Sequence, residues 1–449
     1  MNPEQSTKSL KSRVIDASAW VFGGHVASQL FRLGSNLIMT RLLVPEMFGV
    51  MALAHTVMIG LALFSDLGIR QSIIQNDRGE DTVFLNTAWS LQIIRGGFIC
   101  MIVLVIAAAL GWANQFQWLP QESAYAAPVL PYVLALLSFT ALIQGFESTK
   151  LAMANRKLTL GRITLIELSS QVAGLLLMIG WALLDRSIWA LVAGSLLGTL
   201  SKTVLSHVIL HGQQNRWRWD TASFHELFHF GKWIFLSTMF SYLVGQGQTL
   251  LQGALVSVEI LGFITIAGVF AWAAGSLVGK LAGSVVFPAL SDAARRGGNA
   301  LPRAIHAFQT RMLLLVVPVF LLLSLFSNEL IEFLYDDRYI IVGHYLGIMA
   351  INGALGVLPI FYQNAFLASG DSRQHFIISG VSMLLRVAGI MVGFQVSGVD
   401  GMLYGIGVGS LLRYVYVAVN VRKHGWLVLR GDIPVLLLVF IAYAYGFLA

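Results

Sequence analysis

Apolar stretches alternate with short polar connectors along the whole chain of 449 residues. A stretch of about 20 apolar residues is long enough to cross a membrane as a helix. At least twelve such stretches occur, so the pattern predicts an all-α protein that crosses the membrane many times. We expect these helices at residues 18–40, 48–67, 87–111, 128–146, 163–184, 188–210, 230–255, 260–288, 312–326, 340–367, 376–396 and 401–421, with a further apolar run at 434–449.

The two halves of the chain resemble each other. Residues 33–54 and 246–267 share several identical positions at a constant offset of 213, and residues 172–174 and 387–389 are identical at an offset of 215. Each half holds an even number of spans, so the repeats have the same orientation in the membrane. We therefore predict two pseudo-symmetric six-helix bundles, with room for an extra C-terminal helix.

The longest connector is basic and aromatic, and it contains Arg216, Trp217, Arg218 and Trp219. Such a composition is typical of a short helix at the membrane surface, which we expect here. The predicted organisation is an N-terminal lobe at residues 1–210, a cytoplasmic linker at 211–229, a C-terminal lobe at 230–423 and a C-terminal apolar segment at 424–449.

Positive charge is distributed unequally between the two sets of connectors. Nineteen lysines and arginines lie in one set, which includes the N-terminus and the linker, whereas the opposite set holds Arg41, Arg186 and Arg338. Short cytoplasmic loops collect positive charge. We therefore place the N-terminus and residues 211–229 in the cytoplasm, and residues 112–127 and 328–342 outside.

The composition excludes several other classes of protein. Apolar residues make up 57% of the chain and charged residues 11%, against roughly 45–50% and 25% in soluble domains. The net charge of +7 lies in the cytoplasmic loops, where it fits orientation and anionic lipids better than nucleic acid. The single cysteine, Cys100, and the lack of a Cys/His cluster argue against a disulfide or a zinc site. We expect no signal peptide, cofactor, metal or enzymatic activity.

Charged residues inside the predicted spans carry the functional argument. A charge near the centre of a span costs about 2.5–3.5 kcal/mol on insertion scales, so it is retained only where it faces water, a partner or a ligand. Lys202 and Arg95 lie near the cytoplasmic ends, where their side chains could reach the headgroups instead. The six cations are Arg32, Arg95, Lys202, Lys280, Arg386 and Arg413, and the three anions are Asp66, Glu147 and Glu167.

Several spans carry polar residues at three- and four-residue steps, which places them on one face of a helix. Four such stripes predict a hydrated central cavity, although separate hydrogen bonds between helices are the alternative. Its excess of cations favours an anionic substrate, and arginine suits phosphate because its planar fork donates two hydrogen bonds at once. We expect Arg32, Arg95, Lys280, Arg386 and Arg413 to bind the substrate, and His25, Gln29, Asn36, Gln246 and Ser382 to line the cavity.

Three segments resemble a known family. Residues 41–49 read RLLVPEMFG, residues 64–70 read FSDLGIR and residues 86–89 read NTAW. They are similar to the first three helices of polysaccharide transporters, the Wzx-type flippases. These belong to a superfamily that also holds the multidrug and toxin extrusion (MATE) proteins and the lipid II flippases.

The resemblance implies two six-helix bundles, a V-shaped cationic cavity and alternating access. The implied substrate is an oligosaccharide linked to polyprenyl pyrophosphate, which is moved from the cytoplasmic to the periplasmic leaflet of a bacterial inner membrane during exopolysaccharide or lipopolysaccharide synthesis. The cations of the family's cavity would fall at Arg32, Lys280, Arg386 and Arg413. Many relatives end with two extra helices, whereas this chain has room for one after Arg430.

Asp66, Glu147 and Glu167 are candidates for coupling to H+ or Na+, and structural salt bridges are the alternative for each. Expected partners are the lipid-linked oligosaccharide, membrane lipids and other polysaccharide assembly proteins, but not nucleic acid. A multidrug or metabolite exporter of the same superfamily would instead need carboxylates in its cavity. A membrane-embedded glycosyltransferase would need a large periplasmic loop, which the sequence does not contain.

Overall fold

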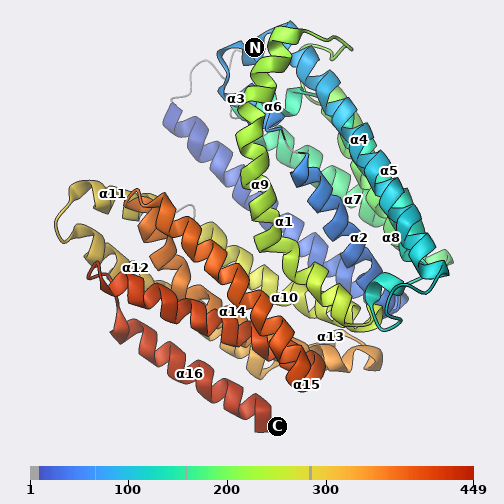
Figure 1. Ribbon diagram of the computed structural model, residues 1–449. Coiled ribbons are helices and arrows are strands. Elements are labelled where there is room, and N and C mark those ends of the chain that lie inside the picture. The colour runs from blue at the N-terminus through green and yellow to red at the C-terminus, as the bar shows by residue number, and fades with distance from the viewer. Residues whose placement is uncertain (1–9, 66, 158, 283–285, 449) are drawn as a thin grey trace. The chain divides into compact units, whose positions relative to one another are not determined.

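The computed structural model describes residues 10–65, 67–157, 159–282 and 286–448, and every regular element within them is a helix (Figure 1). The all-α prediction is therefore confirmed. The chain forms two compact units, Met1–Thr249 and Leu250–Ala449. The division falls inside the helix Thr221–Leu255, whereas the sequence pattern placed it at residues 211–229.

Long helices pack in pairs in the first unit. The pairs α4 with α5 and α7 with α8 have the most extensive contacts, and α1 packs on α7. A bend of 60° separates α5 from α6. The elements are α1 (Leu10–Leu42), α2 (Pro45–Phe64), α3 (Ile69–Gln75), η2 (Asp77–Glu80), α4 (Thr82–Gln115), η3 (Ala124–Ala126), α5 (Leu130–Gly145), α6 (Lys150–Arg156), α7 (Leu160–Leu184), α8 (Trp189–Val208) and α9 (Thr221–Leu255).

The second unit is built around α14 (Ile340–Ala368), which contacts most of the other helices of the unit. Its buried residues recur on several faces, among them Ala350, Leu358 and Phe366, as expected for a helix surrounded by others. The remaining elements are α10 (Val258–Leu281), α11 (Phe287–Arg296), α12 (Ala300–Leu325), α13 (Ser327–Leu334), η5 (Asp337–Tyr339), α15 (Ser372–Arg422) and α16 (Leu429–Leu448).

The helix boundaries repeat with the same offset as the sequence. Helix α1 ends at Leu42 and α9 ends at Leu255, while α2 begins at Pro45 and α10 at Val258. Both pairs of boundaries are 213 residues apart, which is the offset between the similar segments. The repeat seen in the sequence therefore corresponds to a repeated break between two helices.

Eight helices in the described residues are long and apolar enough to cross a membrane, and the bent pair of α5 and α6 makes a ninth. One of the eight, residues 373–422 of α15, is two helical segments that meet at Ser397 and Gly398, where the backbone is not helical. The remaining expected spans fall within helices α1, α9 and α16. The protein is therefore a multi-pass membrane protein.

The eighth span was predicted to end at Pro288, which lies in the first turn of α11, while residues 283–285 before it fall outside the described residues. One expectation about local structure is wrong. The linker forms no separate helix: it is extended up to Asp220, and α9 begins at Thr221.

Polar side chains at the start of α4 explain the extended linker. Three alternate backbone N–H groups, those of Arg216, Arg218 and Asp220, donate to Asn86 Oδ1 (2.9 Å), Ser90 Oγ (3.0 Å) and Thr87 Oγ1 (3.2 Å) respectively. These bonds give the three backbone N–H groups acceptors in an extended conformation, so a helix would gain no additional hydrogen bonds for them. Trp217 and Trp219 are left exposed.

Candidate functional site

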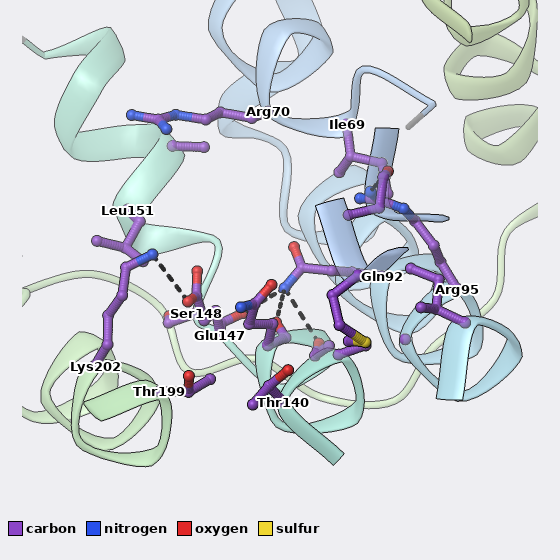
Figure 2. Close-up of a pocket in the computed structure, with 18 of the residues that line it drawn as sticks. Ile69, Arg70, Gln92, Arg95, Thr140, Glu147, Ser148, Leu151, Thr199 and Lys202 are labelled. Atoms are coloured by element: carbon purple, nitrogen blue, oxygen red, sulfur yellow. Dashed lines mark hydrogen bonds and ion pairs between the residues drawn. The ribbon is translucent and has the colours of Figure 1, made fainter. Parts of the chain in front are cut away.

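A cavity of about 380 Å³ lies among α2, α3, α4, α5, α7 and α8 of the first unit (Figure 2). We call it the N-cavity. Three cations and two carboxylates line it, in addition to polar groups such as Gln92 and Thr199. Several residues of the N-cavity are charged residues that the sequence analysis placed inside the predicted spans. The charged residues are Arg70, Arg95, Lys202, Glu147 and Glu167.

Glu147 and Lys202 form an ion pair in the N-cavity, with 3.0 Å between Lys202 Nζ and Glu147 Oε1 (Figure 2). Only 17% of the Glu147 side chain is exposed. The sequence left a salt bridge open for Glu147, and the structure contains one. Removal of either partner would leave a half-buried charge without its counter-ion.

Glu147 is positioned by the break between α5 and α6. The last carbonyls of a helix have no partner within it, and here the Gln92 amide donates to the carbonyls of Gln144, Gly145 and Glu147 at 3.0–3.1 Å. The ring of His207 lies 2.8 Å from the carbonyl of Phe146. The break is therefore a fixed feature of the bundle, and it points a carboxylate at α8.

Arg95 stabilises the end of another helix. Its Nε donates to Ser65 Oγ at 3.1 Å and its Nη2 to the carbonyl of Ala62 at 2.5 Å, both at the C-terminal end of α2. A cation at this position is favourable because the helix dipole is negative there. Arg95 thus has a structural partner, and its role as a substrate ligand remains a prediction.

A second group of polar residues lies in the second unit, around Arg386 and Arg413. These residues occupy the two segments of α15, and a Cβ on Gly409 would lie 3.3 Å from the Cα of Arg386. The two guanidinium groups are close enough to interact electrostatically. We call Arg386 and Arg413 the arginine pair.

Neutral side chains hold one member of the arginine pair. Arg413 Nη2 donates to Gln363 Oε1 at 2.6 Å, and Gln363 Nε2 donates to Ser379 Oγ at 2.8 Å. Among the residues described, neither arginine contacts a carboxylate, and the buried Nε of Arg413 has no hydrogen-bond partner. The pair therefore has unused donors and uncompensated positive charge.

The other predicted residues belong to several helices. On α1, Arg32 is exposed, and the helix is bound to α7 through Ser28, whose hydroxyl donates to Gln171 at 2.8 Å. Ser382, one turn before Arg386, donates to the carbonyl of Ile378 in its own helix. His25, Gln29 and Asn36 lie on α1, Gln246 on α9 and Lys280 on α10; Asp66 and the Lys280 side chain fall outside the described residues.

Sequence reasoning overlooked two residues of these groups, Gln92 and Gln363. Both are uncharged polar residues inside apolar spans, and this feature of the sequence could have identified them as candidates. It also overlooked Asp432, which is fully buried at the start of α16. The sequence pattern placed Asp432 outside the spans, so no partner within the membrane was considered.

Comparison with known proteins agrees with this architecture. A family model described as polysaccharide biosynthesis protein matches residues 38–342. The lipopolysaccharide biosynthesis protein WzxC of Escherichia coli (strain K12) is 19% identical over 403 residues, which are 88% of this chain and 78% of that protein.

Two solved structures share the fold. The inward-facing conformation of a multidrug resistance MATE family transporter superposes with a TM-score of 0.67 at 15% identity, over 92% of this chain and 95% of that one. The lipid II flippase MurJ, in an inward closed conformation, also gives a TM-score of 0.67, at 12% identity over 97% of this chain and 92% of that one. Because the family model spans well over half of the sequence, the chain belongs to the family of polysaccharide biosynthesis proteins.

Proposed function

We propose that this protein moves a polyprenyl-pyrophosphate-linked oligosaccharide from the cytoplasmic to the periplasmic leaflet of the bacterial inner membrane by alternating access. Three findings support the proposal: membership of a polysaccharide biosynthesis family, a multi-pass helical fold and a likeness to the fold of a lipid II flippase. The N-terminus then lies in the cytoplasm, in keeping with the excess of positive charge in that set of connectors.

The arginine pair is the observation that carries the proposal. Two cations inside membrane-spanning segments, of which Arg413 is held by Gln363, have no carboxylate partner among the described residues and require an anion or water for compensation. A pyrophosphate group supplies several acceptor oxygens, and each guanidinium can donate two parallel hydrogen bonds to it. Arg386 and Arg413 therefore bind the pyrophosphate.

The remaining predicted residues complete the substrate path. Arg32, Arg95 and Lys280 add positive charge that attracts the pyrophosphate. His25, Gln29, Asn36, Gln246 and Ser382 supply hydrogen-bonding groups for sugar hydroxyls. The prenyl tail stays in the lipid, because its transfer into a polar space would be unfavourable.

The N-cavity supplies the coupling ion's site. Glu147 and Glu167 both line it, and protonation of Glu147 would remove its attraction for Lys202. Binding of H+ or Na+ is thereby linked to the conformation of α5, α6 and α8. Asp66 is a third candidate carboxylate for this role.

A multidrug exporter is the second candidate function. Two carboxylates in the N-cavity and the likeness to a MATE transporter fold favour it. The Glu147–Lys202 pair counts against it, because that carboxylate already has a cation. The unneutralised arginine pair would also repel a cationic drug.

The test is export by arginine variants in a strain that lacks the gene. Arg386→Ala and Arg413→Ala are expected to abolish export of the lipid-linked oligosaccharide at normal protein levels, whereas the corresponding Arg→Lys variants retain part of it. Arg338→Ala is the matched control, because that arginine pairs with Asp336 at the exposed surface. Normal export by both alanine variants would refute the proposed anion site. Resistance to lipophilic cations without any export defect would instead identify a multidrug exporter.

A further inference from the structure

Two helical hairpins, one in each unit, are built in the same way. Helices α7 and α8 form the first, and the two segments of α15 form the second. In the first, a Cβ on Gly174 would lie 2.6 Å from the carbonyl oxygen of Gly194; in the second, a Cβ on Gly389 would overlap the carbonyl of Gly405. These glycines therefore occupy corresponding positions.

A second pair of glycines extends the correspondence. A Cβ on Gly198 would lie 3.4 Å from the carbonyl oxygen of Ser170, and a Cβ on Gly409 would lie 2.7 Å from that of Leu385. Gly198 follows Gly194 by four residues, as Gly409 follows Gly405. The two hairpins can thus be compared residue by residue.

The comparison places a cation at the same position in each hairpin. Lys202 lies four residues after Gly198, and Arg413 lies four residues after Gly409. Each contacts a side-chain oxygen from a preceding segment of its own unit: Glu147 lies just after the end of α5, and Gln363 lies near the C-terminal end of α14. Lys202 Nζ is 3.0 Å from Glu147 Oε1, and Arg413 Nη2 is 2.6 Å from Gln363 Oε1.

The two acceptors differ in charge. Glu147 neutralises Lys202, whereas Gln363 leaves the charge of Arg413 uncompensated. The preceding segments differ as well: Arg386 lies three residues before Gly389, while the residue three before Gly174 is Gln171, which hydrogen bonds to Ser28. The first unit is therefore neutral at this position, and the second carries two positive charges.

The orientation of the Gln363 amide is fixed by its neighbour. The hydroxyl of Ser379 donates to the carbonyl of His375 at 3.0 Å, so its oxygen is left to accept from Gln363 Nε2. The amide oxygen must then face Arg413. A glutamate would fit the same space and would neutralise the arginine.

We infer that Gln363 determines the specificity of the anion site: it positions the Arg413 guanidinium without neutralising it, so that a pyrophosphate can supply the missing negative charge. Glu147 takes the place of that anion in the first unit. This inference rests on the proposed function, because it names a further residue of the same anion site.

The test measures binding of inorganic pyrophosphate to the full-length protein in nanodiscs by titration calorimetry. Gln363→Glu, which changes charge at almost constant shape, is expected to weaken binding by at least about tenfold, since the carboxylate competes for Arg413. Gln395→Glu is the control, because it makes the same change of charge at an exposed position of α15. We expect Gln395→Glu to change affinity by no more than about threefold.

The converse change keeps the inference testable if Gln363→Glu does not fold. Glu147→Gln gives the first unit the neutral acceptor of the second, and it is expected to add pyrophosphate binding that persists when Arg413 is replaced by alanine. Unchanged affinity in Gln363→Glu, or no added binding in Glu147→Gln, would overturn the inference and leave the anion site intact. An equal loss of affinity in Gln395→Glu would also overturn it. A failure of the unchanged protein to bind pyrophosphate would overturn the proposed anion site itself.

Discussion

The hydroxyl of Tyr362 lies 2.7 Å from Oδ2 of Asp432, and this contact joins α14 to the first turn of α16. Tyr414 donates to the same oxygen at 2.7 Å, and the Gln309 amide donates to the other oxygen. The backbone N–H of Val428 in turn donates to Tyr362 at 3.0 Å. A single carboxylate thus connects α12, α14, α15 and α16.

Replacement of Asp432 by alanine should destabilise the second unit strongly. Three buried donors would lose their acceptor, at a cost of at least about 3 kcal/mol. Thermal unfolding of the detergent-solubilised protein would show a lower midpoint temperature than the unchanged protein. Asp185→Ala, in an exposed loop between α7 and α8, is the control and should change the midpoint little. Equal midpoints for both variants would contradict the role of Asp432.

The connection between η2 and the start of α9 should loosen in acid. Hydrogen bonds from the backbone of Val83 and from Arg78 lower the pKa of Asp81, and hydrogen bonds from Ser223 lower the pKa of Asp220. Because both pKa values are depressed in the folded state, their contribution is present above the unfolded value of about 4 and is lost as the pH falls through the folded values.

Hydrogen exchange can follow this loss at the amides of Arg216 and Arg218, with correction for the intrinsic pH dependence of exchange. Protection should hold from neutral pH to about pH 4 and decline below it. In Asp81→Asn, protection at neutral pH should already be reduced. Protection that persists unchanged at pH 2 would show that these carboxylates do not hold the linker.

A methyl group at Gly389 should disrupt the hairpin of α15. Its Cβ would overlap the carbonyl of Gly405 on the facing segment, and neither backbone can yield without separating the helices. Gly389→Ala is expected to lower stability by about 1–3 kcal/mol and to reduce export. Gly380→Ala lies in the same segment with open space around it. That control should be neutral or slightly stabilising, and a comparable defect in it would exclude a packing explanation.

The cytoplasmic position of the linker can be tested by cysteine labelling in a Cys100→Ser background, since Cys100 is the only cysteine in the sequence. Gln214→Cys in intact cells should resist an impermeant thiol reagent, and Gln121→Cys should react. The basis is the excess of positive charge in the connectors on the linker's side. Reaction at Gln214→Cys would overturn the arrangement of two sets of six spans.

The sequence was a good guide to the helices and a partial guide to the site. Apolar runs located the spans, and the glycines at 401, 405 and 409 indicated close packing because only a residue without a side chain allows it. The linker was misjudged because its conformation depends on Asn86, Thr87 and Ser90, more than 120 positions away in the chain.

The sequence shows which cations lie within the spans, but it does not show which residues contact them. The sequence distinguished Arg95 and Lys202 from Arg386 and Arg413 only by their distance from the ends of the spans. Whether a buried cation is neutralised depends on one contact with a distant segment, such as that of Lys202 with Glu147 across 55 positions. Spacing along one helix carries no information on that contact.

The glycine contacts of the two hairpins also constrain how the protein can move. At these glycines the backbones of the two helices are in direct contact. No side chain lies between them there, so none can repack to give a second arrangement of the helices. Each hairpin therefore moves as one rigid body, and its two helices do not slide past each other. Bending must be confined to the connections at its ends, such as Gly370 before α15, whose positive φ of 88° only glycine adopts easily.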